Sequence, residues 1–173
     1  MLGWSVGVAA ELQANDPDEP MILGLVQRAE IEAEMPEWIA AGVAAEPDLE
    51  AAAGLVEALA GAEVTVYFGT WCSDSGRELP RLWRALDEMG VLDPPEIRYI
   101  GINRAKTEPA EYVAGQDLQL VPTFVVARGG VETGRIVESS PHGIENDLLA
   151  LLRGDETGLI TDSPDLAAER GEL

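Results

Sequence analysis

The stretch VTVYFGTWCSDSGRELPRLW, residues 64–83, changes its periodicity half-way along, and this change decides the fold. Its first part is rich in β-branched and aromatic residues and predicts a buried strand over residues 63–69. Its second part leads into apolar side chains at helical spacing, from Leu79 to Met89, and predicts a helix. Cys72, the only cysteine of the chain, lies at the junction of the two elements.

A thiol at this junction is in a favourable place for chemistry. The carboxyl end of a strand is the usual place for sites in α/β sheets, and the first turn of a helix favours an anion. We therefore expect Cys72 to ionise more readily than an ordinary cysteine. The small polar neighbours Ser73, Asp74 and Ser75 argue against the alternative, an inert thiol in the core. Ser75, one turn on, can donate a hydrogen bond to the thiolate, or is an ordinary first-turn serine.

Three more side chains are candidate modulators of the thiol. Asp74 opposes a thiolate by its charge, although an acid suits a helix N-terminus, and Arg77 can offset it or be a solvated surface arginine. His142 lies in the loop SSPHG, which would border the site if it falls on the Cys72 side of the sheet. A Cys–His pair would activate the thiol further, whereas an exposed loop histidine is the alternative.

The rest of the chain supplies more strands and helices. Strands are predicted in EIRYIGIN and in TFVVARGG and VETGRIVES, which flank a tight turn at Gly129–Gly130. Helical patterns occupy AEIEAEMPEWIAAGVAA, where Pro36 marks a break or a new start, then EPDLEAAAGLVEALAGA and IENDLLALLRG. A strand–helix–strand unit implies a parallel pair and the hairpin adds an antiparallel pair. The fold class is therefore α/β, with a mixed central sheet and helices on both faces.

Composition excludes several kinds of partner and site. The chain of 173 residues carries 32 acidic against 11 basic residues, a net charge of −21, which repels nucleic acid and anionic membranes. One cysteine allows no internal disulfide and no zinc site built on several thiolates, and we expect no metal and no cofactor. The apolar start MLGWSVGVAA lacks the preceding Lys or Arg of a signal peptide. A cytoplasmic protein is expected, or a periplasmic or exported one if this start is a trimmed signal.

The residues around Cys72 resemble those of a known family. VTVYFGTWCSDS resembles the thioredoxin active-site strand and loop, where Trp precedes Cys-x-x-Cys. LVPTFVV resembles the thioredoxin loop that carries a cis-proline before a strand, and RGGVETGRIVES is similar to the hairpin that follows. The resemblance covers roughly residues 48–153 and implies a thioredoxin-like, three-layer α/β/α domain. It leaves residues 1–47 as a partly helical N-terminal extension and residues 154–173 as an acidic tail, either loose or docked.

The resemblance also implies roles for individual residues. Cys72 matches the nucleophile, and Trp71 matches the aromatic side chain that shields it. A groove whose main chain pairs with an extended substrate would be lined by Val121, Pro122 and Thr123. Two departures affect one step: Ser75 replaces the second, resolving cysteine, and Val66 replaces a buried aspartate that assists it.

These residues predict a monothiol thiol–disulfide oxidoreductase. Cys72 would form a mixed disulfide with a disulfide-bearing or glutathionylated protein, and an external low-molecular-weight thiol would complete the cycle. Two other functions stay open. One is a binding module that captures clients covalently through Cys72 or non-covalently in the groove, and the other is a redox-sensing thiol.

Overall fold

A single mixed sheet organises the protein in the computed structural model, which describes residues 21–169. Within them the sheet has six strands in the order β1-β3-β2-β4-β5-β6. The strands are β1 (Gly24–Val26), β2 (Glu63–Phe68), β3 (Ile97–Gly101), β4 (Thr123–Arg128), β5 (Val131–Val137) and β6 (Gly158–Ile160). Strand β2 runs parallel to β3 and antiparallel to β4, and β5 runs antiparallel to β4 and parallel to β6. The predicted α/β class with a mixed sheet is confirmed.

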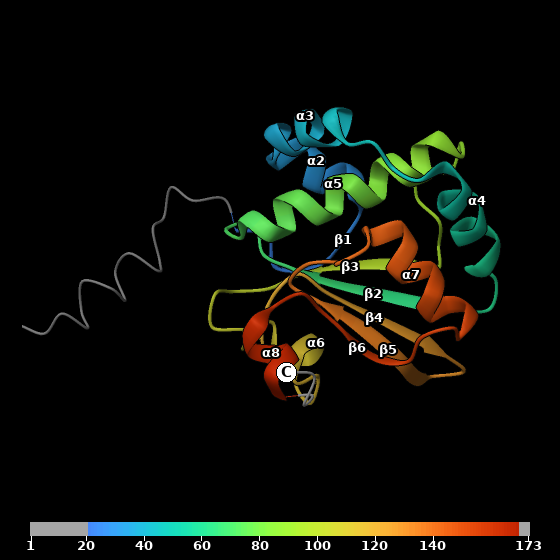
Figure 1. The fold of residues 1–173 in the computed structure, drawn as a ribbon. Helices are drawn as coiled ribbons and strands as arrows, with labels where there is room; N and C mark the ends of the chain where they lie inside the picture. The colour runs from blue at the N-terminus through green and yellow to red at the C-terminus, as the bar shows by residue number, and fades with distance from the viewer. Residues whose placement is uncertain (1–20, 170–173) are drawn as a thin grey trace, which may run out of the picture.

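Helices cover both faces of the sheet (Figure 1). Helices α4, α5 and α7 lie on one face with the α2–α3 pair packed beyond α5, and the short helices α6 and α8 lie on the other. The helices are α2 (Arg28–Glu34), α3 (Pro36–Ala44), α4 (Leu49–Ala58), α5 (Ser73–Glu88), α6 (Ala110–Val113), α7 (Ile144–Arg153) and α8 (Pro164–Glu169). This is the three-layer arrangement that the sequence predicts.

The alternation of strand β2 divides the core between the two faces. Val64, Val66 and Phe68 are fully buried in the large apolar cluster under helices α4, α5 and α7. Tyr67 points the other way, into a smaller cluster that includes Ile100, Ile102, Val113, Val121 and Val125. Trp71 and Cys72 are partly buried and pack against this smaller cluster, which holds the loop after β2 in place.

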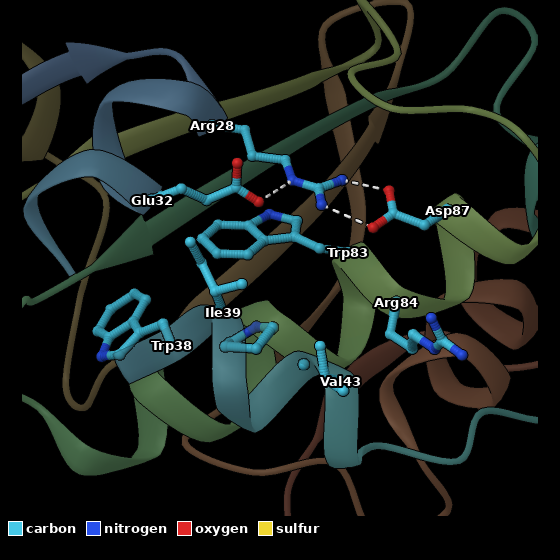
Figure 2. Close-up of a pocket in the computed structure, with 10 residues that line it drawn as sticks. Arg28, Glu32, Trp38, Ile39, Val43, Trp83, Arg84 and Asp87 are labelled. Atoms are coloured by element: carbon cyan, nitrogen blue, oxygen red, sulfur yellow. Dashed lines mark hydrogen bonds and ion pairs between the residues drawn. The ribbon is translucent and has the colours of Figure 1, made fainter. Parts of the chain in front are cut away.

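Arg28 of α2 forms ion pairs that link the N-terminal helices to α5 (Figure 2). The Arg28 guanidinium donates to both carboxylate oxygens of Asp87 at 2.6 and 2.7 Å and to Glu32 at 2.8 Å. It also lies over the ring of Trp83, 5.2 Å from the centroid. Pro36 is the first residue of α3, in agreement with its predicted role as a helix start. We call this contact between α2 and α5 the Arg28 clamp.

The sheet extends beyond residues 48–153 at both of its edges. Strand β1 pairs with β3, and β6, which follows the last long helix, pairs with β5. Gly134 of β5 allows the backbone of β6 to come this close, because a Cβ atom at residue 134 would lie 2.7 Å from the carbonyl oxygen of Gly158. In the segment that follows residue 153, β6 is therefore part of the sheet, and Leu166 of α8 (Pro164–Glu169) is buried. The apolar start of the chain lies outside the described residues.

Candidate active site

Cys72 begins helix α5 immediately after the loop that leaves β2. It is the N-cap residue and has an extended backbone, with φ −104° and ψ 120°. Its amide donates to the carbonyl of Gly69 at 3.0 Å, and its own carbonyl accepts from the amide of Gly76 at 3.1 Å. The turn and the helix together fix the Cα position of Cys72, while its side chain remains partly exposed. Cys72 therefore lies between a strand and a helix, as the sequence predicts.

The thiol faces the loop that contains Pro122. The Sγ atom of Cys72 donates to the carbonyl oxygen of Val121 at 3.2 Å. The Val121–Pro122 peptide bond is cis. Cys72 and Val121 are 49 positions apart in the sequence. The antiparallel pairing of β2 with β4 brings them together. The structure thus joins the two segments on which the resemblance depends.

Thr123 occupies a different place from the one expected. It is fully buried, and its hydroxyl donates to the carbonyl of Leu120 at 2.7 Å. Strand pairing with Tyr67 and Val137 holds it on both sides. Its side chain therefore cannot line a groove, and it stabilises the loop of Val121 and Pro122 from below.

Trp71 forms a platform beside the thiol. Its Nε1 donates to the carbonyl oxygen of Ile102 at 3.0 Å. Its ring lies so close to Gly69 that a Cβ atom there would be 2.6 Å from Nε1 and 2.7 Å from Cζ2. The guanidinium of Arg104 lies over the Trp71 ring, 5.1 Å from the ring centroid. We call the pair the Trp71–Arg104 platform.

Of the two alternatives for Ser75, a hydrogen bond to the thiolate and an ordinary first-turn serine, the described structure contains only the second. It is fully buried in the first turn of α5, and its Oγ accepts from the amide of Gly69 at 3.3 Å. No hydrogen bond joins Ser75 to Cys72 in the part of the chain that the structure describes. The serine therefore shapes the loop between β2 and α5. Val66, the other departure from thioredoxin, is fully buried in the apolar core.

Charges on the first turns of α5 balance one another. Arg77 donates to Asp74 at 2.7 Å and to Glu78 at 3.0 Å. The pair with Asp74 agrees with one of the two alternatives for Arg77, compensation of the Asp74 charge, and the Arg77 side chain is also 54% exposed, as the other alternative has it. Glu78 is 5% exposed, and burial raises the pKa of its carboxyl group, an effect that the hydrogen bond from Arg77 opposes.

His142 lies in an exposed loop at the start of α7. Its imidazole is 76% exposed, and its Nδ1 is 2.9 Å from the buried carboxylate of Asp147. The same carboxylate accepts from the amide of His142 and from the hydroxyl of Ser140. The interactions of His142 in the described structure thus go to the start of α7, which corresponds to the alternative interpretation, and they do not include Cys72.

Sequence reasoning missed Gly69, Ile102 and Arg104 as parts of the site. Ile102 and Arg104 follow the end of β3, which runs parallel to β2. The carboxyl ends of two parallel neighbours meet at one edge of a sheet, so the residues after β3 were predictable neighbours of the loop that carries Cys72. The segment INR was the available signal.

Metal and membrane features are absent from the described residues. Between residues 21 and 169, no group of three or more His, Cys, Asp or Glu side chains could hold a metal ion. Over the same range, no helix is both long and apolar enough to cross a membrane.

Comparison with known proteins adds limited support. No family model matches the chain. A protein of Acanthamoeba polyphaga mimivirus named as thioredoxin-like is 28% identical over 83 residues, which cover 48% of this chain and 57% of the relative. The fold is thioredoxin-like. The match supports a thioredoxin-like relationship, although the chain spans just over half the length of that relative.

A solved structure supports the fold alone. The crystal structure of a protein of unknown function from Pseudomonas aeruginosa matches with a TM-score of 0.50 and 18% identity. The match covers 75% of this chain and 93% of that one. The thioredoxin-like fold of this chain hosts many functions, so the function must be argued from the residues around Cys72.

Proposed function

We propose that the protein is a monothiol thiol–disulfide oxidoreductase that acts through Cys72. The observation that carries the proposal is the contact of 3.2 Å between the Cys72 sulfur and the Val121 carbonyl, in front of the Pro122 loop. Two further features support the proposal. The Cys72 thiol is partly exposed at the start of a 16-residue helix, whose first turn favours an anion. In the proposal, the main chain of the Pro122 loop pairs with an extended substrate. The proposed substrates are disulfide-bearing or glutathionylated proteins.

The first step is attack by the Cys72 thiolate on one sulfur of the substrate disulfide. A bond forms between the Cys72 sulfur and that sulfur, and the old S–S bond breaks. The departing sulfur leaves as a thiolate and takes a proton from solvent. When Cys72 loses its own proton, the Val121 carbonyl loses the hydrogen bond that the thiol donates to it. That carbonyl is then able to accept an N–H from the bound substrate.

The second step needs a thiol from outside the chain. Ser75 occupies the position of a resolving cysteine, and its hydroxyl cannot exchange with a disulfide. Val66 is apolar and fully buried, so no carboxylate is present there to take a proton from a second thiol. A low-molecular-weight thiol therefore attacks the mixed disulfide and leaves as a new disulfide, while Cys72 returns to its reduced form. For a glutathionylated protein and glutathione, the products are the protein thiol and oxidised glutathione.

Turnover of a glutathionylated peptide tests this proposal. With glutathione supplied, the wild-type protein should release the peptide thiol catalytically, and Cys72→Ala should fall to the uncatalysed rate. Ser73→Ala is the matched control, because Ser73 is the exposed neighbour of Cys72 and has no part in the mechanism. Reduction of insulin with a dithiol should stay slow, since the chain lacks a second thiol. Equal rates for wild type and Cys72→Ala would refute the proposal.

The lack of an internal resolving thiol favours one alternative function. A mixed disulfide on Cys72 persists when no external thiol reaches it, which is the behaviour of a covalent capture module. In that case, client proteins would remain attached under non-reducing conditions and be lost with Cys72→Ala, while glutathione would give no turnover. Equal binding by Cys72→Ala would indicate non-covalent capture in the groove.

A further inference from the structure

Among the described residues, strand β1 leaves one side of its main chain without a partner. It is an edge strand of the sheet, and its inner side pairs with β3. Two large apolar side chains at this edge, Leu23 and Leu25, are 44% and 50% exposed. An uncovered edge strand presents a row of N–H and C=O groups with which another strand can pair. The edge is therefore a place where an extended segment can join the sheet.

A hollow borders this edge on the sheet face that carries the long helices. Its volume is about 450 Å³, and it lies between β1 and helix α2. Four apolar side chains and two carboxylates line it: Met21, Ile22, Val26, Ala33, Glu30 and Glu34. Because the side chains of a strand point alternately to the two faces of a sheet, every second residue of an added strand would reach this hollow.

The two carboxylates of the hollow give it a negative charge. Glu30 accepts a hydrogen bond from the amide of Gln27 at 2.8 Å through one of its oxygens, and Glu34 is exposed. A Lys or Arg side chain matches such a hollow, because its aliphatic stem packs against apolar residues while its cation reaches the carboxylates. The lining therefore favours a basic residue at alternate positions of the added strand.

The arginines of the adjoining elements are directed to other partners. Arg28 of α2 is paired with Glu32 and Asp87. Arg98 of β3 donates to the hydroxyl of Thr65 at 3.1 Å, and Thr65 belongs to β2, on the side of β3 away from β1. The negative charge at the edge of β1 is thus left for a cation from outside the described residues.

We propose that the edge of β1 and this hollow form a docking site for an extended basic segment of a partner protein. The segment adds to the sheet as a strand beside β1, and its main chain supplies the pairing. Its Lys or Arg side chains at alternate positions face Glu30 and Glu34. The net charge of −21 attracts the same class of partner at longer range. The site does not depend on the chemistry of Cys72, because β3 lies between β1 and β2.

Short synthetic peptides with blocked ends test the site on the full chain. One alternates Lys and Val, a second has Glu in place of Lys, and a third has Pro in place of Val. The third keeps the charge but cannot pair as a strand. Fluorescence anisotropy would measure binding, and amide NMR signals would locate it. The Lys–Val peptide should bind saturably and shift the signals of residues 23–26, and the other two should bind at least tenfold more weakly.

A matched pair of variants separates the hollow from the net charge. Glu34→Gln should weaken binding of the Lys–Val peptide about twofold to fivefold, as expected for loss of one exposed ion pair. Glu57→Gln removes the same charge from an exposed position of α4 and should leave the affinity unchanged. Equal effects of the two variants would overturn the site, as would equal binding of the Lys–Pro peptide. Absence of saturable binding up to about 1 mM peptide would also overturn it.

Hydrogen exchange of the free chain distinguishes the other occupants of this edge. The β1 amides that do not pair with β3 should exchange rapidly at every protein concentration and become protected when the Lys–Val peptide is added. Protection that grows with protein concentration would indicate a second copy of the chain. Protection at every concentration would indicate a segment of the same chain. Either result would overturn a basic partner segment as the occupant.

Discussion

Gly69 is the last residue before the loop that carries Trp71 and Cys72, and its lack of a side chain makes room for the Trp71 ring. In Gly69→Ala the new Cβ atom would lie 2.6 Å from Nε1 and 2.7 Å from Cζ2 of that ring. Real contacts of this kind are not this short, so the ring must move. Its movement breaks the hydrogen bond to Ile102 and the contact with Arg104.

The expected loss of stability follows from these two interactions. The hydrogen bond contributes about 1 kcal/mol, and its loss leaves a carbonyl of the fully buried Ile102 without its donor. The cation–π contact contributes about 0.5–1 kcal/mol. Replacing glycine by alanine also restricts the unfolded chain, which stabilises the folded state by about 0.4–1 kcal/mol. We therefore expect Gly69→Ala to lower the unfolding free energy by about 1 kcal/mol, and the melting temperature by about 2–4 °C.

A double-mutant cycle with Trp71→Ala makes this reasoning refutable. Without the indole, the three atoms nearest to the new Cβ atom are gone. In that background Gly69→Ala should be neutral or slightly stabilising, so the sign of its effect should reverse. Urea denaturation of the four proteins measures the cycle. An equal loss of stability in both backgrounds would show that Trp71 is not what requires a glycine at this position.

Three further predictions concern other parts of the fold. Asp87→Asn should lower the unfolding free energy by about 1–2 kcal/mol by breaking the Arg28 clamp, with a smaller effect at about 1 M salt; an effect independent of salt would contradict the ion pair. Asp48→Ala should cost about 1 kcal/mol in thermal unfolding, because the Asp48 carboxylate accepts two amides at the start of α4; no change would mean that this cap is dispensable. Burial raises the pKa of Glu78, so the folded chain holds this proton more tightly than the unfolded chain and stability falls as pH rises from about 4.5 through the raised value. Glu78→Gln should gain stability relative to wild type across that window in urea titrations, and a difference constant with pH would count against it.

The sequence could predict the elements around Cys72 because their local signals are strong. Strand β2 and helix α5 have clear and different periods, and Gly129–Gly130 marks the hairpin with two residues of positive φ. The same is true of α4, which lies within the helical pattern EPDLEAAAGLVEALAGA. Each of these features depends on residues close to one another in the chain.

The features that sequence reasoning missed are ones that the local pattern of residue types does not determine. Strand β6 has three residues, and its pairing is possible only because Gly134 lets its backbone approach. The hydroxyl of Ser75 turns to the Gly69 amide, a choice that the spacing between Ser75 and Cys72 does not reveal. Thr123 was expected in the groove, but its place within the strand pairing buries it. In each case, tertiary packing decides where the side chain points.

Mass spectrometry of the intact protein during turnover tests the central claim most directly. The reaction of a glutathionylated peptide would be quenched with acid at intervals, before and after glutathione is added. The account predicts that one glutathione becomes attached to Cys72, that it remains there without a second thiol, and that it disappears on addition of glutathione as fast as the catalytic rate. Absence of this adduct, or turnover that proceeds unchanged in Cys72→Ser, would contradict the account.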